Sequence, residues 1–456
     1  MTKDRIIGRT WRRLAQLALG GTASIVAPAI ATNLLRIASS VTLTRLLDSR
    51  AFGVVGIVTS VAIIVQLVSD IGVLPFVVRH QRGDDPVFLD EIWTLRLLRS
   101  AVLTIIMAAA AVPFSNFMEK PELGVVLAVW SVTFILDGFS SMAFATAIRK
   151  QKLWRLTISE FAASAAQLAI ALVLALILRS YWALVIAMLI SASMKVFLSY
   201  ALFPNSRRRW ALSRERAREV WTFSRFIAPS SLMTVLILQI DKMVLARVMP
   251  LAAYGLYAIA ATLSAAGPAL AASYARRVLY PAYAEVVRTD RAALSQFYYS
   301  KRRPVTLLYM AGMGGVCGSA RLVVAILYDA RYMQVATYLQ LLGISAVLTL
   351  ANIAAEEALI AVGRVRATLY ANATRMIWMI ASVCAAVLTH QAMLIVAGIG
   401  SIEVPAMLLY WLYLRRLDLF DFREELLGLL AGGAGAIAGL FLADIALFFI
   451  VPLKFF

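Results

Sequence analysis

The stretch LTRLLDSRAFGVVGI, residues 43–57, decides the fold because it recurs in the second half of the chain. The later copy is LARVMPLAAYGLYAI, residues 245–259, at an offset of 202 residues (43 to 245). Leucine, arginine, alanine, glycine and isoleucine coincide at corresponding positions, and an aromatic residue precedes the first glycine of each copy (Phe52 and Tyr254). Two matching stretches in the two halves of one chain indicate an internal repeat.

Two further correspondences support this repeat. The basic segment Lys150–Lys152 stands opposite Arg364–Arg366 at an offset of 214 residues (150 to 364), and proline interrupts both lead helices, at Pro28 and Pro229. Each match alone could arise by chance among apolar helices, but their common order predicts two six-helix lobes of the same membrane topology. The arginine and glycine of the repeated stretch could equally serve only to build a tight turn.

The composition predicts a membrane protein. The 456 residues are 62% hydrophobic and 15% charged, with a mean hydropathy of +0.82, whereas soluble domains have about 45–50% apolar and about 25% charged residues. Apolar runs long enough to cross a hydrocarbon layer of about 30 Å recur along the whole chain. These runs are too long and too uniformly apolar for barrel strands, so we expect an all-α polytopic membrane protein.

About thirteen transmembrane helices are expected. Their approximate spans are 20–47, 52–78, 93–115, 122–148, 156–178, 181–203, 219–248, 252–275, 304–328, 333–361, 367–388, 391–414 and 426–451. We therefore expect an N-lobe of six helices at 1–212, a C-lobe of six helices at 213–420, and an additional C-terminal transmembrane segment at 421–456. The polar segments at 204–218 and about 284–303 are expected to be loops.

The net charge of +19 has a distribution that excludes nucleic acid as a partner. Lys and Arg gather in short clusters between apolar runs, and most fall into alternate loops, as the positive-inside rule requires. This alternation predicts a cytoplasmic N-terminus. The basic N-terminus, Met1 to Arg13, is followed by a run too long for a signal-peptide core, which we interpret as a retained first helix.

The sequence predicts no cofactor, no metal site and no enzymatic activity. Cys317 and Cys384 lie alone within apolar runs, and His80 and His390 have no ligand-like neighbours. The chain has no GxxxxGK[ST] phosphate loop, so ATP hydrolysis is not expected.

The repeated stretches resemble the polysaccharide flippase family, the Wzx-like branch of the multidrug/oligosaccharidyl-lipid/polysaccharide exporter superfamily. The resemblance rests on TRLLDSRAFGVVGI (44–57), SDIGVLPFVVR (69–79), SYWALVIAMLI (180–190), LQIDKMVLARVMPLAAYGLYAIA (238–260) and RRVLYPAYAEV (276–286). Members commonly have 12 or 14 helices, and here a single span follows the twelfth.

The resemblance implies a V-shaped two-lobe fold that works by alternating access, with the transport path between the lobes. The implied substrate is an oligosaccharide linked to a polyprenyl diphosphate, flipped from the cytoplasmic to the periplasmic leaflet for exopolysaccharide, capsule or O-antigen assembly. Implied partners are membrane lipids and the polysaccharide polymerase and glycosyltransferases of the same pathway. Ion coupling fits the superfamily, but no motif here demonstrates it.

Ionisable residues within apolar runs are the candidate site residues, because a charge at the bilayer centre costs about 2.5–3.5 kcal/mol on insertion scales. Four cations could line a cleft that binds the lipid diphosphate: Arg36, Arg225, Lys242 and Arg375. Arginine matches phosphate oxygens with two parallel donors. Arg36 lies deepest, and the alternative for it is a structural ion pair.

The acids within the apolar runs are Asp70, Asp137, Glu160, Asp241, Glu356, Glu357, Glu403 and Asp444. We single out Asp241, Glu160 and Asp70 as partners of the cleft cations or as ligands of a coupling ion. Asp241 is adjacent to Lys242, so the two side chains point to different sides of their helix. Neutralisation of cleft cations and ion coupling both stay open for these acids.

Two alternatives to a flippase stay open. An ion-driven multidrug-type exporter of small amphiphiles should have a mainly acidic cavity, which the mid-helix Arg36 disfavours. A membrane polysaccharide polymerase or ligase should have a large extramembrane loop, which the chain lacks. Finally, Gly432, Gly435 and Gly439 include a GxxxG spacing, which predicts close packing of the last helix within the chain or between two copies.

Overall fold

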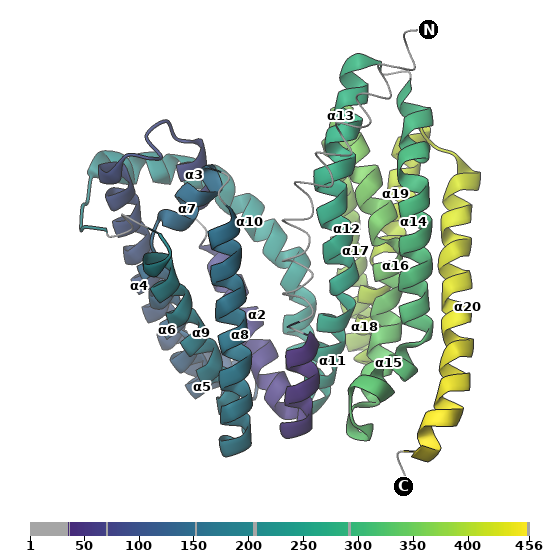
Figure 1. The fold of residues 1–456 in the computed structure, drawn as a ribbon, viewed down its shortest axis with the longest axis horizontal. Coiled ribbons are helices and arrows are strands. Elements are labelled where there is room, and N and C mark those ends of the chain that lie inside the picture. The colour runs from purple at the N-terminus through teal and green to yellow at the C-terminus, as the bar shows by residue number, and fades with distance from the viewer. Residues whose placement is uncertain are drawn as a thin grey trace. The chain divides into compact units, whose positions relative to one another are not determined.

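The computed structural model describes residues 35, 37–69, 72–150, 153–203, 208–290 and 293–453. Within these ranges it leaves out the side chains at 75, 79, 153, 154, 157, 223, 225–238, 240 and 450–453. Every regular element in the described part is a helix, which confirms the all-α class (Figure 1).

The chain divides into two compact units, Met1–Gln239 and Ile240–Phe456. The division falls inside α10 (Arg214–Val248), so this helix contributes to both units. The lobe boundaries at 212 and 420 stay predictions.

In the described part of the first unit, eight helices with assigned bounds precede α10. They are α2 (Ser49–Val68), α3 (Val73–Arg79), α4 (Pro86–Phe117), α5 (Glu122–Trp130), α6 (Val132–Phe139), α7 (Ala143–Arg149), α8 (Leu153–Leu178) and α9 (Trp182–Ala201).

The second unit continues from the end of α10. Its elements are α11 (Leu251–Ser264), α12 (Ala266–Tyr274), a π-helical turn η1 (Ala275–Leu279), α13 (Tyr280–Thr289), α14 (Leu294–Gly318), α15 (Ala320–Leu327), a 3-10 turn η3 (Ala330–Tyr332), α16 (Gln334–Ala361), α17 (Arg366–Thr389), α18 (Met393–Gly400), α19 (Glu403–Arg415) and α20 (Phe422–Leu453).

The described helices confirm a multi-pass membrane protein. Ten of them are long and apolar enough to cross a bilayer, or eleven when the bent pair α14 and α15 counts as one span. These eleven correspond in order to eleven of the expected spans. The remaining two, at 20–47 and 219–248, include residues or side chains outside the described part, so the total of thirteen stays a prediction.

Two segments expected to be loops are partly helical. Helix α10 begins at Arg214, inside the expected loop at 204–218, and the larger correction concerns α14. It begins at Leu294, ten residues before the expected start at 304. The sequence between them looks polar, but Leu294, Tyr298 and Arg302 are buried on one side of the helix. Positions 294, 298 and 302 recur every four residues, so a buried stripe extends the helix into what the charges suggested was a loop.

The repeated stretch folds in the same way in both copies. Helices α2 and α11 begin at Ser49 and Leu251, which are 202 residues apart like the repeat itself (49 to 251). The isoleucines of the two copies, Ile57 and Ile259, are 0% and 2% exposed. In the first copy, Asp48 caps the start of α2, because its side chain accepts a hydrogen bond from the amide of Ala51. In the second copy, Pro250 occupies the corresponding position before α11.

Corresponding helices also pack in corresponding pairs. In the first unit α2 packs on α5, α4 on α5 and α6, α6 on α9, and α8 on α9. In the second unit α11 packs on α16, α14 on α16, α16 on α18 and α19, and α17 on α18 and α19. The helices of both units therefore pair in the same order along the chain, as expected for an internal repeat.

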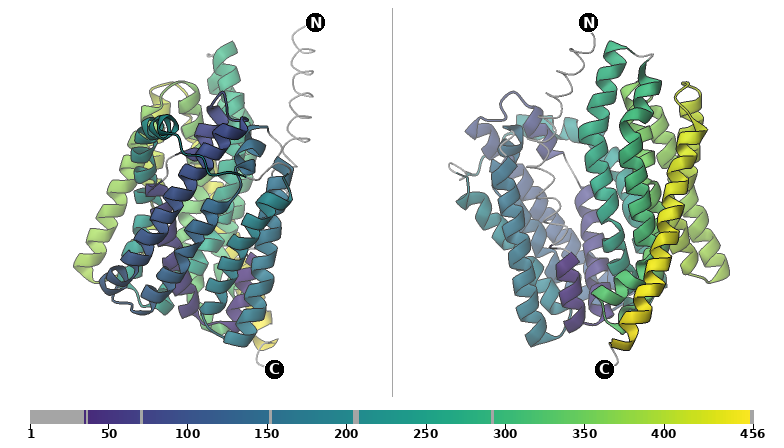
Figure 2. Two further views of the ribbon diagram at one scale, coloured as in Figure 1. Left: turned by 90° about the vertical axis from the view of Figure 1, so that its left-hand side faces the viewer. Right: turned by 45° about the vertical axis from the view of Figure 1, so that its right-hand side comes forward.

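Helix α20 lies outside this repeat and packs along α14 and α15 (Figure 2). A Cβ atom on Gly314 would lie 2.1 Å from the carbonyl oxygen of Gly432, and one on Gly435 would lie 2.1 Å from that of Ala311. Only glycine permits this approach of two backbones. Gly432, Gly435 and Gly439 of α20 therefore serve packing within the chain.

Candidate functional site

The predicted site residues fall into three groups. Arg36 and Asp70 lie outside the described residues, and the side chain of Arg225 is outside the description as well. Asp241, Lys242 and Arg375 lie in the second unit. Glu160 lies on α8 of the first unit, where it is exposed.

Arg375 on α17 lies at a break in the span that contains α18 and α19. Helix α18 ends at Gly400, α19 begins at Glu403, and the amide of Ile402 donates to the carbonyl of Ile399 at 3.3 Å. Glu403 is thus the first residue after the break. The Nη2 atom of Arg375 donates to its Oε2 atom at 2.7 Å.

Two asparagines complete this cluster. The amide nitrogen of Asn352 on α16 donates to Oε2 of Glu403 at 2.6 Å and to its backbone carbonyl at 2.9 Å. Nη1 of Arg375 donates to Oδ1 of Asn372 at 2.9 Å. The guanidinium lies 5.9 Å from the ring centroid of Tyr410, whose hydroxyl is buried without a described partner. The cluster therefore neutralises Arg375 within the second unit and keeps unsatisfied polar atoms beside it.

Asp241 on α10 is a second buried charge, 7% exposed. Its Oδ2 atom accepts a hydrogen bond from the hydroxyl of Tyr257 on α11 at 3.1 Å, while Oδ1 is buried without a described hydrogen-bond donor. The next residue, Lys242, is half-buried. The described contacts therefore hold Asp241 through Tyr257 of the same unit and leave one carboxylate oxygen without a described donor.

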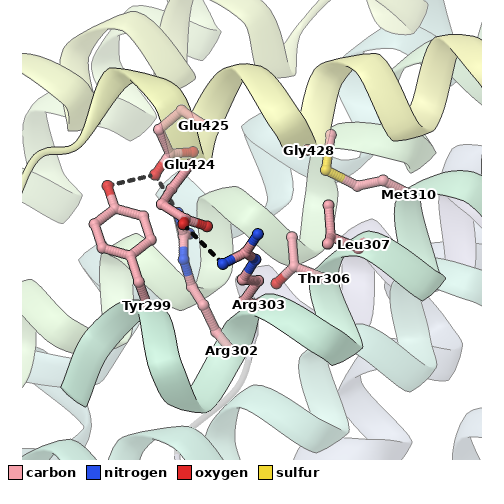
Figure 3. A pocket seen from close by; sticks show the side chains of 9 residues that line it. All are labelled: Tyr299, Arg302, Arg303, Thr306, Leu307, Met310, Glu424, Glu425 and Gly428. Atoms are coloured by element: carbon pink, nitrogen blue, oxygen red, sulfur yellow. Dashed lines mark hydrogen bonds and ion pairs between the residues drawn. The ribbon is translucent and has the colours of Figure 1, made fainter. Parts of the chain in front are cut away.

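The sequence did not identify a second buried ion pair in the second unit, Arg302 with Glu425. Arg302 on α14 forms a hydrogen-bonded ion pair with Glu425 on α20, and both side chains are almost fully buried. The hydroxyl of Tyr299 donates to the same carboxylate at 3.1 Å (Figure 3). Because Arg302 follows Lys301 and precedes Arg303, the sequence presents it as one member of a basic loop. The four-residue spacing from Leu294 and Tyr298 was the available signal.

A shallow pocket opens beside this pair, between α14 and α20. Its polar side carries Arg303 and Glu424, which form an ion pair at 3.2 Å, and its apolar side carries Leu307, Met310 and Gly428 (Figure 3). The pocket is far too small for an oligosaccharide, so we assign it no role in transport.

Comparison with known sequences identifies a family. Residues 42–337 match a family model described as polysaccharide biosynthesis protein. The chain is also 21% identical over 303 residues to the succinoglycan biosynthesis transport protein ExoT of Rhizobium meliloti (strain 1021). That alignment covers 66% of this chain and 61% of ExoT, so the match spans less than two thirds of the relative's length.

Comparison with solved structures shows a shared fold. A lipid II flippase, MurJ, in an inward closed conformation matches with a TM-score of 0.70 at 10% identity, covering 93% of this chain and 100% of MurJ. An inward-facing multidrug resistance transporter of the MATE family matches with a TM-score of 0.61 at 16% identity. The match covers 85% of this chain and 94% of that transporter. The eukaryotic MATE transporter AtDTX14 matches with a TM-score of 0.52 at 15% identity, and the match covers 91% of this chain and 98% of AtDTX14. These likenesses show the fold of the chain.

Proposed function

The chain belongs to the polysaccharide biosynthesis protein family, and from that premise we propose that it flips a polyprenyl-diphosphate-linked oligosaccharide from the cytoplasmic to the periplasmic leaflet of a bacterial inner membrane. The observation that carries the proposal is the family match, which extends across both units of the chain. The fold shared with a lipid flippase supports it.

The substrate dictates what the site must supply. A diphosphate carries dense negative charge, which has to cross a medium where an isolated charge is costly. Arg36, Arg225, Lys242 and Arg375 would supply compensating positive charge along the path, with bidentate hydrogen bonds from the arginines. Asp241, Glu160 and Asp70 would balance these cations when the site is empty or would bind a coupling ion.

Arg375 has a specific part in this proposal. It already pairs with Glu403, so a diphosphate could engage it only in competition with that carboxylate. Such competition would let the site exchange one anion for another without leaving a buried cation unpaired. Arg36 and Lys242 would then make the first contacts with the substrate.

The test is transport by the purified full-length protein in liposomes that contain a fluorescent polyprenyl-diphosphate oligosaccharide. We expect Arg36→Ala to abolish flipping and Arg36→Lys to restore part of it, because an ammonium cannot make the bidentate contact. Arg179→Ala, which removes an exposed arginine between α8 and α9, is the matched control and should flip normally.

Two results would overturn parts of the proposal. Normal flipping by Arg36→Ala at equal reconstitution would exclude Arg36 as a substrate contact while leaving the function intact. No flipping by the unmodified protein, together with efflux of a small cationic dye, would instead establish the multidrug-type alternative.

A further inference from the structure

The segment at 208–216, which leads into α10, contacts the first turns of α4. Arg208, whose side chain is 7% exposed, approaches Asp90 with an Nη1–Oδ1 distance of 3.4 Å. Arg216, whose side chain is 6% exposed, donates from Nε to Oε2 of Glu91 at 2.9 Å. Two buried arginines from an arginine-rich segment thus bind two consecutive acids of one helix.

Two further contacts lie between these ion pairs. The indole rings of Trp210 and Trp93 meet edge to face, with centroids 5.8 Å apart. The backbone amide of Ala211 donates to the hydroxyl of Thr94 at 3.1 Å. The segment at 208–216 is therefore held at four points, and its remaining side chains have a fixed direction.

The opening of α10 has two different faces. Arg216, Val220 and Ser224 recur every four residues and are 5% exposed each. Arg214 and Arg218 lie on the opposite side and are exposed. Spacing of this kind defines an amphipathic helix whose outer face is basic.

Large apolar side chains are also exposed along the segment and the opening of α10. Trp210, Leu212 and Trp221 are 67%, 67% and 71% exposed. Arg209 is exposed between Arg208 and Trp210, and among the described residues no ion pair involves Arg209, Arg214 or Arg218. We define the basic–aromatic face as Arg209, Trp210, Leu212, Arg214, Arg218 and Trp221.

We propose that this basic–aromatic face binds anionic phospholipid headgroups of the leaflet nearest the start of α10. Indole rings favour the headgroup level of a bilayer, where their apolar body and polar N–H are both satisfied. Unpaired arginines beside them attract phosphate through charge and paired hydrogen bonds. A soluble protein partner would not require the indoles and arginines to lie at the edge of a membrane span.

The face lies at the start of the helix shared by both units. Helix α10 begins at Arg214 and continues past Gln239 to Val248. Lipid bound to the face would hold the start of this helix at the bilayer surface and leave the buried Arg216 and Arg208 in their ion pairs. The inference does not depend on which substrate the protein carries.

The test compares retention of phosphatidylglycerol and phosphatidylcholine by the full-length protein, measured by native mass spectrometry after release from mixed nanodiscs. Each surface arginine contributes about fivefold to binding of an anionic lipid. We expect Arg209→Gln, Arg214→Gln and Arg218→Gln together to reduce the preference for phosphatidylglycerol at least tenfold. The three corresponding lysine substitutions should retain most of it.

The control removes three exposed arginines that have no exposed tryptophan beside them, by Arg277→Gln, Arg364→Gln and Arg366→Gln. This triple variant changes the net charge by the same amount but leaves the basic–aromatic face intact, so the proposal expects it to keep the preference within about twofold. An equal loss in both triple variants would reduce the effect to general surface charge and overturn the proposal. Release of the lipid by equimolar inorganic phosphate would overturn it as well, because the site would then bind a free anion.

Discussion

Arg375 of α17 and Glu403 of α19 are joined by a hydrogen-bonded ion pair of 2.7 Å at the point where α18 gives way to α19. Glu403 is held in turn by Asn352. A charged side chain therefore follows a helix break within a membrane span, and the neighbouring helix α17 supplies its counterion. The pair can be essential for stability, for transport or for both, and substitutions separate these roles.

The first prediction concerns the stability of this pair. Arg375→Ala or Glu403→Ala alone leaves one charge buried without a partner and should lower the free energy of unfolding by about 3–5 kcal/mol. Arg375→Met combined with Glu403→Leu should recover most of that loss. Thermal unfolding in detergent measures both. If Arg375→Ala unfolds like the unmodified protein yet fails to flip lipid, Arg375 acts on the substrate alone.

The second prediction concerns the glycines between α14 and α20. Gly435→Ala would place a methyl group 2.1 Å from the carbonyl oxygen of Ala311, and overpacking of this kind costs about 1–3 kcal/mol. Gly433 has no atom within 4 Å of the position of a Cβ, so Gly433→Ala is the matched control. It should be neutral or slightly stabilising. Equal thermal unfolding of the two variants would contradict the close helix packing.

The third prediction concerns membrane topology. The basic clusters near Arg209, Arg291 and Arg364 should lie in the cytoplasm. In a chain without Cys317 and Cys384, a membrane-impermeant thiol reagent applied to intact spheroplasts should label Asp329→Cys and should miss Arg209→Cys. Both positions are exposed, so accessibility within the protein does not differ. Labelling of Arg209→Cys before lysis would reverse the orientation.

The fourth prediction concerns pH. Burial acts to raise the pKa of Asp84, but hydrogen bonds and charges from Lys150 and Arg149 outweigh it and hold that pKa below its ordinary value of 3.8. Since the folded pKa is depressed, the stabilisation is present above pH 3.8 and is lost as the pH falls through the folded value. Asp84 is 45% exposed, so the gain is at most about 1 kcal/mol.

Asp84→Asn should accordingly lower the melting temperature slightly at pH 7, and the difference from the unmodified protein should shrink towards pH 3. Glu215→Gln removes an exposed carboxylate outside any described ion pair and serves as the control. A difference for Asp84→Asn that grows on acidification would contradict the assigned ion pairs.

The apolar spans were predictable because length and hydropathy act locally. A run that crosses the bilayer must be helical, whatever it packs against. The repeat was predictable as well, because the residues of the repeated stretch determine locally where α2 and α11 begin. The early start of α14 was missed because three basic residues precede Pro304, and local charge concealed a buried stripe.

The ion pairs depend on tertiary structure and were only partly predictable. Glu403 was identified as an acid within an apolar run. Its pairing with Arg375 was not predictable, because the two residues lie on different helices and only the tertiary structure brings them into contact. Arg302 and Glu425 are separated by 123 residues, and neither stands inside an obvious span. The break before Glu403 had a local signal that the predicted spans did not use, because Gly400 ends α18 and Pro405 stands in the first turn of α19.

The buried pair between Arg302 and Glu425 also bears on how such a chain could have evolved. Helix α20 lies outside the helix pairings that the two units share, and an ancestor built of the repeat alone would have lacked it. Once α20 supplied the acid that balances Arg302, its loss would have stranded a guanidinium in an apolar interior. An appended helix would thereby have become obligatory, and reversion to the ancestral length would have required the arginine to change first.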